Sequence, residues 1–437
     1  MKDEGKFPLF KDVVGLDDEI EELESIIDIL KDPKKYEKFG ASMTKGILLH
    51  GIPGVGKTFL IRALANEIGI PVYPVVAGDV KYSSGSAECK TLKEVFDLAG
   101  KSAPSVVLID EIDSFIESHP YQGPNDVILN QLLTLMDGFE QHHKVIVIGA
   151  TNDIKKIPRS LMRPGRFDRR LEIELPSDQF REIALKKYFQ ACNLEPNFSY
   201  EKVSILLEYA TMAEIKHVAN ETIIQAIKND TEISEEHVIN AYDRHQMGLM
   251  KKDDGRSKEQ IMRVAIHEAG HTLANYHIND IDSIARVSVA KQNYIDGYIR
   301  LINRKKDTHT EHELKNKVVT SLAGYAAELC FYNEVSAGAS SDIAVATRIA
   351  EDMVYECGMS ALGPRKFRSR EDHMSNEFSN TLQKALEDET GKIINQALEE
   401  AKRIVAMHKD KIETIANHLA EKKVLSTLEL KQLITEH

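Results

Sequence analysis

The segment Gly51–Thr58 places glycines, a lysine and a threonine at the spacing G-x-x-x-x-G-K-[ST]. Such a loop wraps phosphate oxygens with backbone N–H groups, because glycines let the chain approach closely. Lys57 would then supply charge to the β- and γ-phosphates of ATP, and the Thr58 hydroxyl would ligate Mg²⁺. The other loop residues expected to hold the phosphates are Pro53, Gly54, Val55 and Gly56. A glycine-rich turn without a ligand is the weaker interpretation, because the loop lies between a strand pattern and a helix pattern.

Two acids follow the apolar run 106–109. Asp110 suits the coordination sphere of Mg²⁺ through its charge, and Glu111 suits polarisation of the water that attacks the γ-phosphate. Taken alone, the two acids are explained equally well as a solvated strand end. The phosphate loop earlier in the chain favours the magnesium interpretation, because the spacing and the strand order agree.

Asn152 ends the next strand pattern, where it is placed to orient the same water. The run 163–170 (RPGRFDRR) then carries four arginines. A guanidinium that reaches the γ-phosphate bound by a neighbouring subunit would stabilise charge in the transition state. The alternative interpretation of this run is a solvated basic loop.

A second constellation, His267-Glu268-x-x-His271, fits H-E-x-x-H within a helical pattern. Positions i and i+4 share one helix face, so that His267 and His271 can hold one Zn²⁺ together. Glu268 is then placed to act as general base on a water that the metal binds. A chance match with core or solvated histidines is the alternative, and this motif alone does not remove it.

A catalytic zinc keeps three protein ligands and one open position, so a third ligand must come from elsewhere in the chain. Asp342 is the first candidate and Glu328 the second. Asp342 is also explained as an acidic residue in the first turn of a helix. His309 and His312 lie in a polar run and are interpreted as solvated.

The elements that must position these residues follow from the apolar patterns of the first half. Strand patterns cover 46–50, 71–77, 105–110, 144–150 and 171–175, and helical patterns between them include 59–68 and 91–99. This alternation predicts a parallel sheet with helices on both faces. After Pro176 the patterns become helical, with Ser177 and Ser234 as expected N-caps before acidic first turns.

The second half is predicted to be mainly helical. Helical patterns cover 258–277, 312–332 and 341–356, a small sheet is expected from 284–289 and 297–301, and 368–377 reads as a polar loop. Near the end of the chain, Ser426 and Glu429 form an expected capping box. The run 248–258 is polar and lacks apolar periodicity, which favours a linker between the two halves.

Composition limits the kinds of partner. A chain of 437 residues suggests two to four domains. The net charge of −13 disfavours a general nucleic-acid or anionic-membrane surface, although it leaves room for a local basic patch. The longest apolar runs are strand-sized, whereas a membrane-spanning helix needs about 20 apolar residues. We therefore expect no membrane-spanning segment, with peripheral membrane contact left open.

The cysteines indicate a reducing compartment. Four are present, none in a Cys-x-x-Cys pair, and they are interpreted as isolated buried thiols: Cys89, Cys192, Cys330 and Cys357. A disulfide framework and a cysteine zinc site are both disfavoured. We expect a cytoplasmic protein.

Together, the motifs resemble those of the FtsH-type AAA+ zinc metalloproteases. The resemblance covers most of the chain and rests on the order of seven segments. In sequence order, these segments are Phe10–Gly15, Gly51–Thr58, Asp110-Glu111, Ala150–Asn152, 163–170, His267–His271 and Gly338–Asp342. It implies an α/β AAA+ P-loop ATPase, with a parallel sheet in a large subdomain and a small helical lid, followed by a mainly α-helical zinc metallopeptidase domain. The corresponding limits are 1–176, 177–247, a linker at 248–258, and 259–437.

The resemblance also implies roles that spacing does not give. Val14 and Gly15 would lie near adenine, Arg166 and Arg169 would act in trans as arginine fingers, and Asp342 would be the third zinc ligand. The cofactors would be ATP, Mg²⁺ and Zn²⁺. Members are similar hexameric rings that thread unfolded protein into a peptidase chamber, which implies a homo-hexamer acting on protein substrates.

Two features depart from the family pattern. Members usually carry membrane-spanning segments before the ATPase module, and we expect none in this sequence, which would make it either a soluble relative or a chain that lacks its anchor. The pore loop of the family has a Phe-hydrophobic-Gly motif, whereas the corresponding run Lys81–Ser86 offers Tyr82 as its aromatic residue.

Three hypotheses follow. The leading one is ATP-dependent proteolysis of protein substrates. The second is a remodelling ATPase or chaperone with weak or no proteolysis, suggested by the altered pore loop. The third is an ATP-independent zinc peptidase whose ATPase half senses nucleotide.

Overall fold

The computed structural model describes residues 8–32, 35–36, 38–40, 44–76, 92–115, 125–138, 144–251, 255–293, 295–302, 308–367 and 378–435. The chain divides into two compact units, residues 1–238 and 239–437. Within the described ranges, no helix combines the length and the apolar character needed to cross a membrane. The pore-loop residue Tyr82, Cys89 and the polar loop 368–377 lie outside these ranges.

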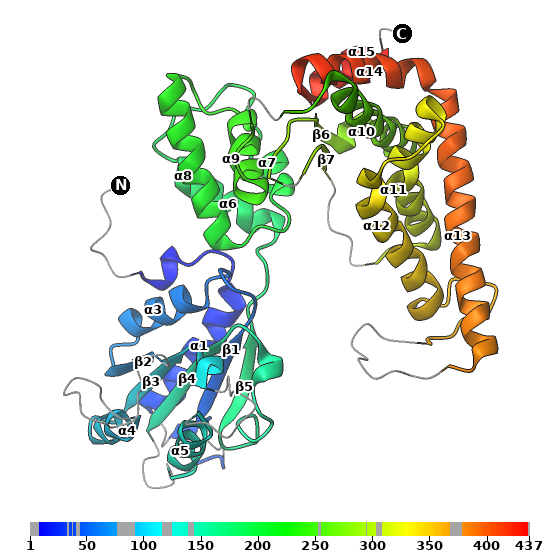
Figure 1. Ribbon diagram of the computed structural model, residues 1–437. Coiled ribbons are helices and arrows are strands. Elements are labelled where there is room, and N and C mark those ends of the chain that lie inside the picture. The colour runs from blue at the N-terminus through cyan, green and yellow to red at the C-terminus, as the bar shows by residue number, and fades with distance from the viewer. Residues whose placement is uncertain are drawn as a thin grey trace. The chain divides into compact units, whose positions relative to one another are not determined.

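A five-stranded parallel sheet lies at the centre of the first unit, in the order β2-β3-β4-β1-β5 (Figure 1). Its strands are β1 (Gly46–His50), β2 (Val72–Val76), β3 (Ser105–Asp110), β4 (Val145–Thr151) and β5 (Phe167–Glu172). The central strands are rich in valine, isoleucine and leucine and are buried along almost their whole length, as expected of parallel strands covered on both faces. The expected α/β class is therefore found.

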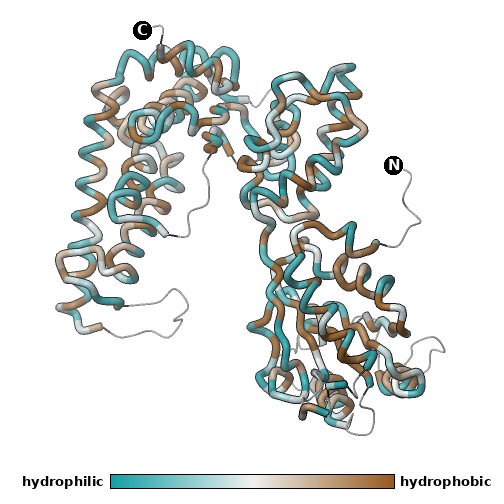
Figure 2. Tube along the Cα trace, turned by 180° about the vertical axis from the view of Figure 1, so that it is seen from behind, coloured by the Kyte–Doolittle hydropathy of each residue, from teal (hydrophilic) through white to brown (hydrophobic). Residues whose placement is uncertain are grey.

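Helices cover both faces of this sheet because successive strand residues point to opposite sides. On one face, Ile47 and Leu49 pack with α1 and α3. On the other, Leu48 packs with α4 and α5. These helices are α1 (Asp17–Lys31), α3 (Lys57–Glu67), α4 (Leu92–Lys101) and α5 (Asn125–Asp137). Figure 2 shows hydrophobic residues running along the strands between them.

The fifth strand begins four residues earlier than the apolar pattern 171–175 predicted. Phe167, wholly buried, pairs with Gly46, and Arg169 and Arg170 continue the strand along β1. Because β5 is an edge strand, its residues 168–170 are exposed on both faces of the sheet, and these charged residues interrupt the apolar pattern. The other four strand predictions agree with the structure to within one residue.

A helical subdomain follows the sheet, as expected. It contains α6 (Asp178–Phe189), α7 (Tyr200–Leu206), α8 (Met212–Asn229) and α9 (Glu235–Met247). Both expected N-caps are confirmed: the Ser177 hydroxyl accepts from the N–H of Phe180, and that of Ser234 accepts from the N–H of His237. Thr211 adds a capping box at the start of α8.

The boundary between the compact units lies inside α9. The second half of that helix belongs to the second unit because Asp243, which is 1% exposed, forms ion pairs with Arg286 and Arg300 and accepts from the Tyr298 hydroxyl. The linker predicted at 248–258 follows α9 and ends where α10 begins. The predicted domain limits themselves stay a prediction.

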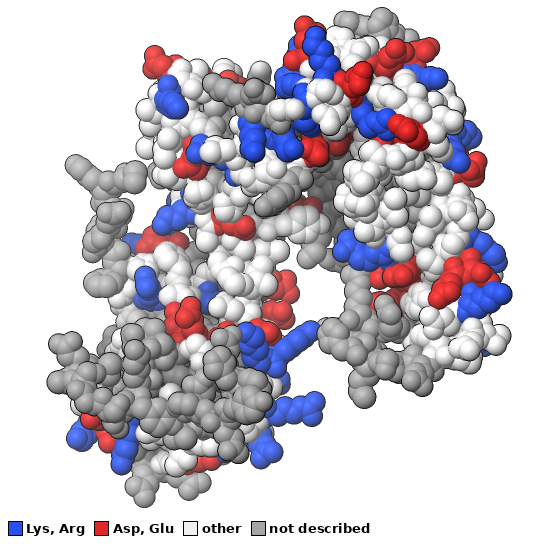
Figure 3. Space-filling view, in the orientation of Figure 1, with Lys and Arg blue, Asp and Glu red and all other residues white. Residues whose placement is uncertain are grey.

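The second unit is mainly helical, as predicted. Its helices are α10 (Lys258–Asn279), α11 (Glu311–Tyr332), α12 (Ser340–Glu351), α13 (Asn380–Met407), α14 (Lys409–Lys422) and α15 (Thr427–Thr435), with a π-helical turn at Asp352–Glu356. Its antiparallel sheet has the order β7-β6-β8, formed by β6 (Ile284–Ser288), β7 (Tyr298–Leu301) and β8 (Val424–Ser426). On the face of this unit that is visible in Figure 3, positively and negatively charged side chains are interspersed.

Three details of the second unit bear on the sequence predictions. The capping box at Ser426 and Glu429 is confirmed, since the N–H of Ser426 donates to the Glu429 carboxylate at 2.9 Å. The strand β8 was not predicted, because three residues are too few for a periodic pattern. The interpretation of the cysteines as buried thiols is wrong for Cys330 and Cys357, which are exposed.

Candidate nucleotide and metal sites

The loop after β1 turns directly into α3. Gly54 and Gly56 adopt φ angles of +84° and +116°, in the left-handed region that glycine enters without strain. A methyl group on Gly54 would lie 2.8 Å from the Thr211 hydroxyl oxygen at the start of α8. The backbone of the loop therefore lies between the sheet and the lid, with the N-terminus of α3 at its end, which is a favourable geometry for phosphate.

Lys57 is 6% exposed and begins α3. Its ammonium group donates to the carbonyl oxygens of Gly51 and Ile52, at 2.6 and 2.9 Å. Burial lowers the pKa of Lys57, and the charges of Asp110 and Asp113 offset part of that shift. The lysine is thus held beneath the loop as a concentrated positive charge.

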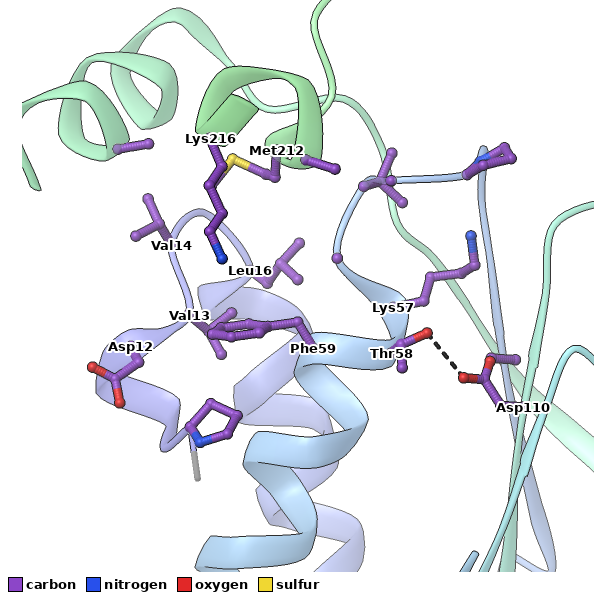
Figure 4. Close-up of a pocket in the computed structure, with 18 of the residues that line it drawn as sticks. Asp12, Val13, Val14, Leu16, Lys57, Thr58, Phe59, Asp110, Met212 and Lys216 are labelled. Carbon is purple, nitrogen blue, oxygen red and sulfur yellow. Dashed lines mark hydrogen bonds between the residues drawn. The ribbon is translucent and has the colours of Figure 1, made fainter. Parts of the chain in front are cut away.

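Thr58 and Asp110 meet across the end of the sheet. The threonine hydroxyl donates to Oδ2 of Asp110 at 3.0 Å, as Figure 4 shows. Glu111 follows with a φ of +54°, which residues other than glycine rarely adopt. A hydroxyl and a carboxylate at this distance form a suitable pair of oxygen ligands for Mg²⁺.

These residues line one end of a cavity of about 1130 Å³, and the other end of this cavity is lined mainly by apolar side chains. Of the residues predicted to bind or act on nucleotide, it is lined by Val14, Pro53, Gly54, Val55, Gly56, Lys57, Thr58, Asp110, Glu111 and Asn152. Gly15 does not line it. Instead, Gly15 makes a turn with φ of +79°, and a methyl group there would lie 2.6 Å from the ring of Phe180.

The apolar end has lining residues that the sequence did not reveal. Phe59 of α3 and Met212 and Lys216 of α8 line this end, and the side chain of Lys216 extends down from the lid (Figure 4). Met212 and Lys216 are four residues apart and so share one helix face. The spacing of a phosphate loop carries no information about a helix more than 150 residues further along the chain.

Neither predicted arginine finger lines the cavity of its own chain. Arg166 donates to both oxygens of Asp137, at 2.8 and 2.6 Å. Arg169 projects from β5 and donates to Glu22 at 2.9 Å, with 56% of its side chain exposed. A role toward the nucleotide of a neighbouring subunit stays a prediction.

In the second unit, α10 carries His267, Glu268 and His271 in its buried middle. Small residues let α11 come close to this stretch, since a methyl group on Gly270 would lie 2.5 Å from Cβ of Ala327. The helix begins at a capping box formed by Ser257 and Gln260. Close helix packing therefore brings residues of α11 against both histidines.

Hydrogen bonds fix the orientation of each imidazole. Nδ1 of His271 donates to the carbonyl oxygen of Thr320 at 2.7 Å, and Nδ1 of His267 donates to Oε1 of Glu328 at 2.7 Å. Both acceptors lack protons, so each Nδ1 carries a hydrogen and each Nε2 is the ring nitrogen that is free to bind a metal. The two Nε2 atoms lie 3.1 Å apart.

Asp342 completes a group of three electron-pair donors. Its Oδ2 lies 2.9 Å from Nε2 of His267 and 3.3 Å from Nε2 of His271. Such a group needs a proton or a cation at its centre. Burial lowers the pKa of His267, but hydrogen bonds to Asp342 and Glu328 outweigh burial and raise it to about 10. Burial raises the pKa of Asp342, and its bonds to both histidines reverse that shift and lower it overall.

The donor set and the space around it fit Zn²⁺. Two imidazole nitrogens and one carboxylate oxygen form a common catalytic zinc set. Among the described residues, one group of side chains could hold a metal ion together. It consists of His267, His271 and Asp342, whose ligand atoms lie within 4.8 Å of one another. Gly324 leaves the space beside both Nε2 atoms open, because a methyl group there would lie 2.4 Å from each.

Glu268 lies next to this group and is 7% exposed. Burial raises its pKa, and the nearby histidines offset part of that effect. Gly297, just before β7, packs against it so closely that a methyl group would lie 2.6 Å from Oε1 of Glu268. A buried carboxylate with a raised pKa beside a metal position has the properties of a general base.

Glu328, the second candidate for the third ligand, lies on the other side of His267. Its Oε1 accepts from Nδ1, whereas the metal position faces Nε2. The N–H and the hydroxyl of Ser336 also donate to this carboxylate, at 2.8 and 3.0 Å. The hydrogen-bonding role of Glu328 has no signature in the sequence. His309 and His312 are not part of the group of potential ligands.

Comparison with known proteins agrees with the two sites. A model of the AAA family, ATPases associated with various cellular activities, matches residues 47–175, and a model of peptidase family M41 matches residues 255–433. An ATP-dependent zinc metalloprotease FtsH of Caldicellulosiruptor bescii is 34% identical over 98% of this chain and 72% of its own length. The chain belongs to the FtsH family.

Other FtsH proteins are also similar to nearly the whole of this chain. The ATP-dependent zinc metalloprotease FtsH 2 of Thermoanaerobacter is 37% identical and is covered over 83% of its length. The FtsH protein of Bacillus subtilis is 33% identical over 99% of this chain and 70% of its own length. The likeness therefore spans the AAA and M41 parts together, in the order that the sequence motifs predicted.

Proposed function

We propose that this chain is an ATP-dependent zinc metalloendopeptidase that unfolds and degrades protein substrates. The observation that carries the proposal is the convergence of His267, His271 and Asp342 beside Glu268. The same chain builds a phosphate loop whose Thr58 contacts Asp110. Membership of the FtsH family supports both halves of the proposal.

In the peptidase half, Nε2 of His267, Nε2 of His271 and Oδ2 of Asp342 would hold Zn²⁺. When bound, zinc supplies Lewis-acid chemistry that polarises a scissile carbonyl and activates water. Glu268 would accept the proton of the attacking water and deliver it to the leaving amine. Burial favours this role because it brings the pKa of the carboxyl closer to neutrality.

In the ATPase half, the backbone of Pro53–Gly56 and the ammonium group of Lys57 would bind the phosphates. Thr58 and Asp110 would hold Mg²⁺, which neutralises charge that develops on the phosphates. Glu111 and Asn152 would orient the attacking water, since both line the same cavity. Val14 would contact adenine directly, while Gly15 shapes the turn that carries it.

The assembly that we propose is a homo-hexameric ring. Arg166 and Arg169 would then stabilise the γ-phosphate of the neighbouring subunit. Both are held by acids of their own chain, so either arginine would exchange Asp137 or Glu22 for the phosphate. The exposure of Arg169 makes that exchange inexpensive.

The setting that we propose is cytoplasmic. The described cysteines are free thiols, which fits a reducing compartment. The net charge of −13 argues against a nucleic-acid partner. Peripheral membrane contact is compatible with this setting.

A degradation assay tests the proposal. Purified protein, zinc and an unfolded fluorescent protein are incubated with and without ATP, beside Glu268→Gln. Fragments that require both ATP and Glu268 support the coupled protease. An uncut substrate with continuing ATP turnover would contradict the proposed function and favour a remodelling ATPase. Cleavage that persists in Glu111→Gln would favour an ATP-independent peptidase.

A further inference from the structure

Arg263 lies on α10 one helical turn before His267 and joins three side chains of the neighbouring segment. Its Nη2 donates to Oε1 of Glu334 at 2.5 Å, and its Nη1 lies 3.5 Å from Oε2 of Glu328. Its guanidinium also lies over the ring of Tyr332, 4.4 Å from the centroid. No step of the proposed reaction uses this arginine directly.

The carboxylate of Glu328 is the link between Arg263 and the metal position. Its side chain is 2% exposed, and a charge so deeply buried needs both hydrogen bonds and a compensating cation. Ser336 supplies two hydrogen bonds, and Arg263 is the arginine or lysine that pairs with Glu328 among the described residues. Arg263 and the N–H of Ser336 engage Oε2, whereas the Ser336 hydroxyl and Nδ1 of His267 both donate to Oε1.

The orientation of His267 depends on that last hydrogen bond. A ring turned away from Glu328 would no longer direct Nε2 toward His271 and Asp342. Residues that hydrogen-bond a metal-binding histidine set both its tautomer and its orientation. Arg263 acts one step further out, because it holds the acceptor rather than the histidine.

We propose that Arg263 is a positioning residue for the metal centre, acting through Glu328 on the ring of His267. This inference rests on the zinc function proposed above. The competing explanation is that Arg263 only ties α10 to Glu334 and Tyr332 near the surface. Replacement of Glu334 distinguishes the two explanations. Its side chain is 67% exposed and pairs with Arg263, and among the described residues it forms no hydrogen bond or ion pair with His267.

The experiment is a double-mutant cycle on the dissociation constant of zinc. Metal-stripped full-length variants are titrated with zinc against a chromophoric chelator at fixed pH. Arg263→Met is expected to weaken binding about threefold to tenfold, less than the roughly 10–100-fold expected for Glu328→Gln. In the Glu328→Gln background, Arg263→Met is expected to add nothing, since its effect passes through that carboxylate.

Three variants control for a merely structural effect. Arg263→Lys keeps the charge and is expected to recover part of the affinity. Glu334→Gln removes the exposed partner and is expected to leave the dissociation constant unchanged. Arg403→Met makes the same chemical change in an exposed pair with Glu400 on α13 and is also expected to change nothing.

Two results would overturn the role of Arg263. One is an unchanged dissociation constant in Arg263→Met, and the other is a full additional loss on top of Glu328→Gln. A different result would overturn the metal centre itself: wild-type protein that binds no stoichiometric zinc, or His267→Ala that binds it as tightly as wild type. The two failures are therefore distinguishable in one set of titrations.

Discussion

Gly324 faces His267 at the point where the metal ligands converge. A methyl group in place of its hydrogen would lie 2.4 Å from Nε2 of His267 and at the same distance from Nε2 of His271. Zinc–nitrogen bonds are about 2.0–2.1 Å long, so a methyl group this close to both Nε2 atoms would crowd an ion that they bind. The requirement for glycine here is steric, since its backbone is helical.

Replacement of Gly324 by alanine is therefore expected to abolish stoichiometric zinc binding, because the methyl group would displace the two imidazoles or block an ion bound to them. ATP hydrolysis is expected to continue. Gly391→Ala on α13 is the matched control, since a methyl group there would meet no atom within 4 Å. Metal analysis after dialysis measures the outcome. One equivalent of zinc retained by Gly324→Ala would contradict the proposed position of the ion.

Glu111 provides a test of the nucleotide site. Glu111→Gln keeps the size of the side chain but removes the charge that polarises the attacking water. We expect the rate of ATP hydrolysis to fall about 10²–10⁴-fold while binding of ATP persists. Turnover is measured as phosphate release, and binding is measured with a fluorescent ATP analogue. Unchanged turnover would show that another residue activates the water.

Zinc binding is expected to depend on pH through His267. Its hydrogen bonds to Asp342 and Glu328 outweigh burial and raise its pKa to about 10, so the metal-free site holds a proton at neutral pH. Zinc must displace that proton, and its apparent affinity should weaken about tenfold for each pH unit below 10. Calorimetry in buffers of different ionisation enthalpy should find about one proton released per zinc near pH 8. Binding without proton release would contradict this linkage.

The buried ion pairs of Asp243 predict a large stability effect. Arg286 is 3% exposed and lies 3.1 Å from Asp243, so Asp243→Ala would remove a carboxylate that compensates this buried positive charge. We expect the free energy of unfolding of the second unit to fall by about 3–5 kcal/mol. Urea unfolding followed by circular dichroism measures it. Glu400→Gln, which breaks the exposed pair with Arg403, should leave the free energy of unfolding nearly unchanged. Equal losses in both variants would refute the importance of the buried cluster.

The sequence predicted those features that follow from local periodicity. His267 and His271 share a helix face however that helix packs against its neighbours. Lys57 follows the glycines of its loop whatever the exact residue at which the preceding strand ends. The strands β1 to β4 were recognised because two covered faces require continuous apolar runs. The predicted start of β5 was wrong because this edge strand carries the exposed charges of Arg169 and Arg170, one toward each face of the sheet, before its apolar residues begin.

Features that depend on how distant elements pack were not predictable. Glu328 and Asp342 both had the chemistry of a third ligand. The structure separates them by the depth at which α11 and α12 lie against α10, since one reaches Nδ1 and the other Nε2 of His267. Met212 and Lys216 enter the nucleotide cavity only because the lid folds back over the loop. No spacing within a single motif records such contacts.

We propose that ATP turnover and zinc proteolysis are coupled in this chain. The most direct measurement follows a stably folded fluorescent substrate, with fragments analysed alongside fluorescence, in wild type, Glu111→Gln and Glu268→Gln. Coupling predicts loss of fluorescence with fragments in wild type, neither in Glu111→Gln, and loss of fluorescence without fragments in Glu268→Gln. Fragments produced by Glu111→Gln at the wild-type rate would contradict coupling.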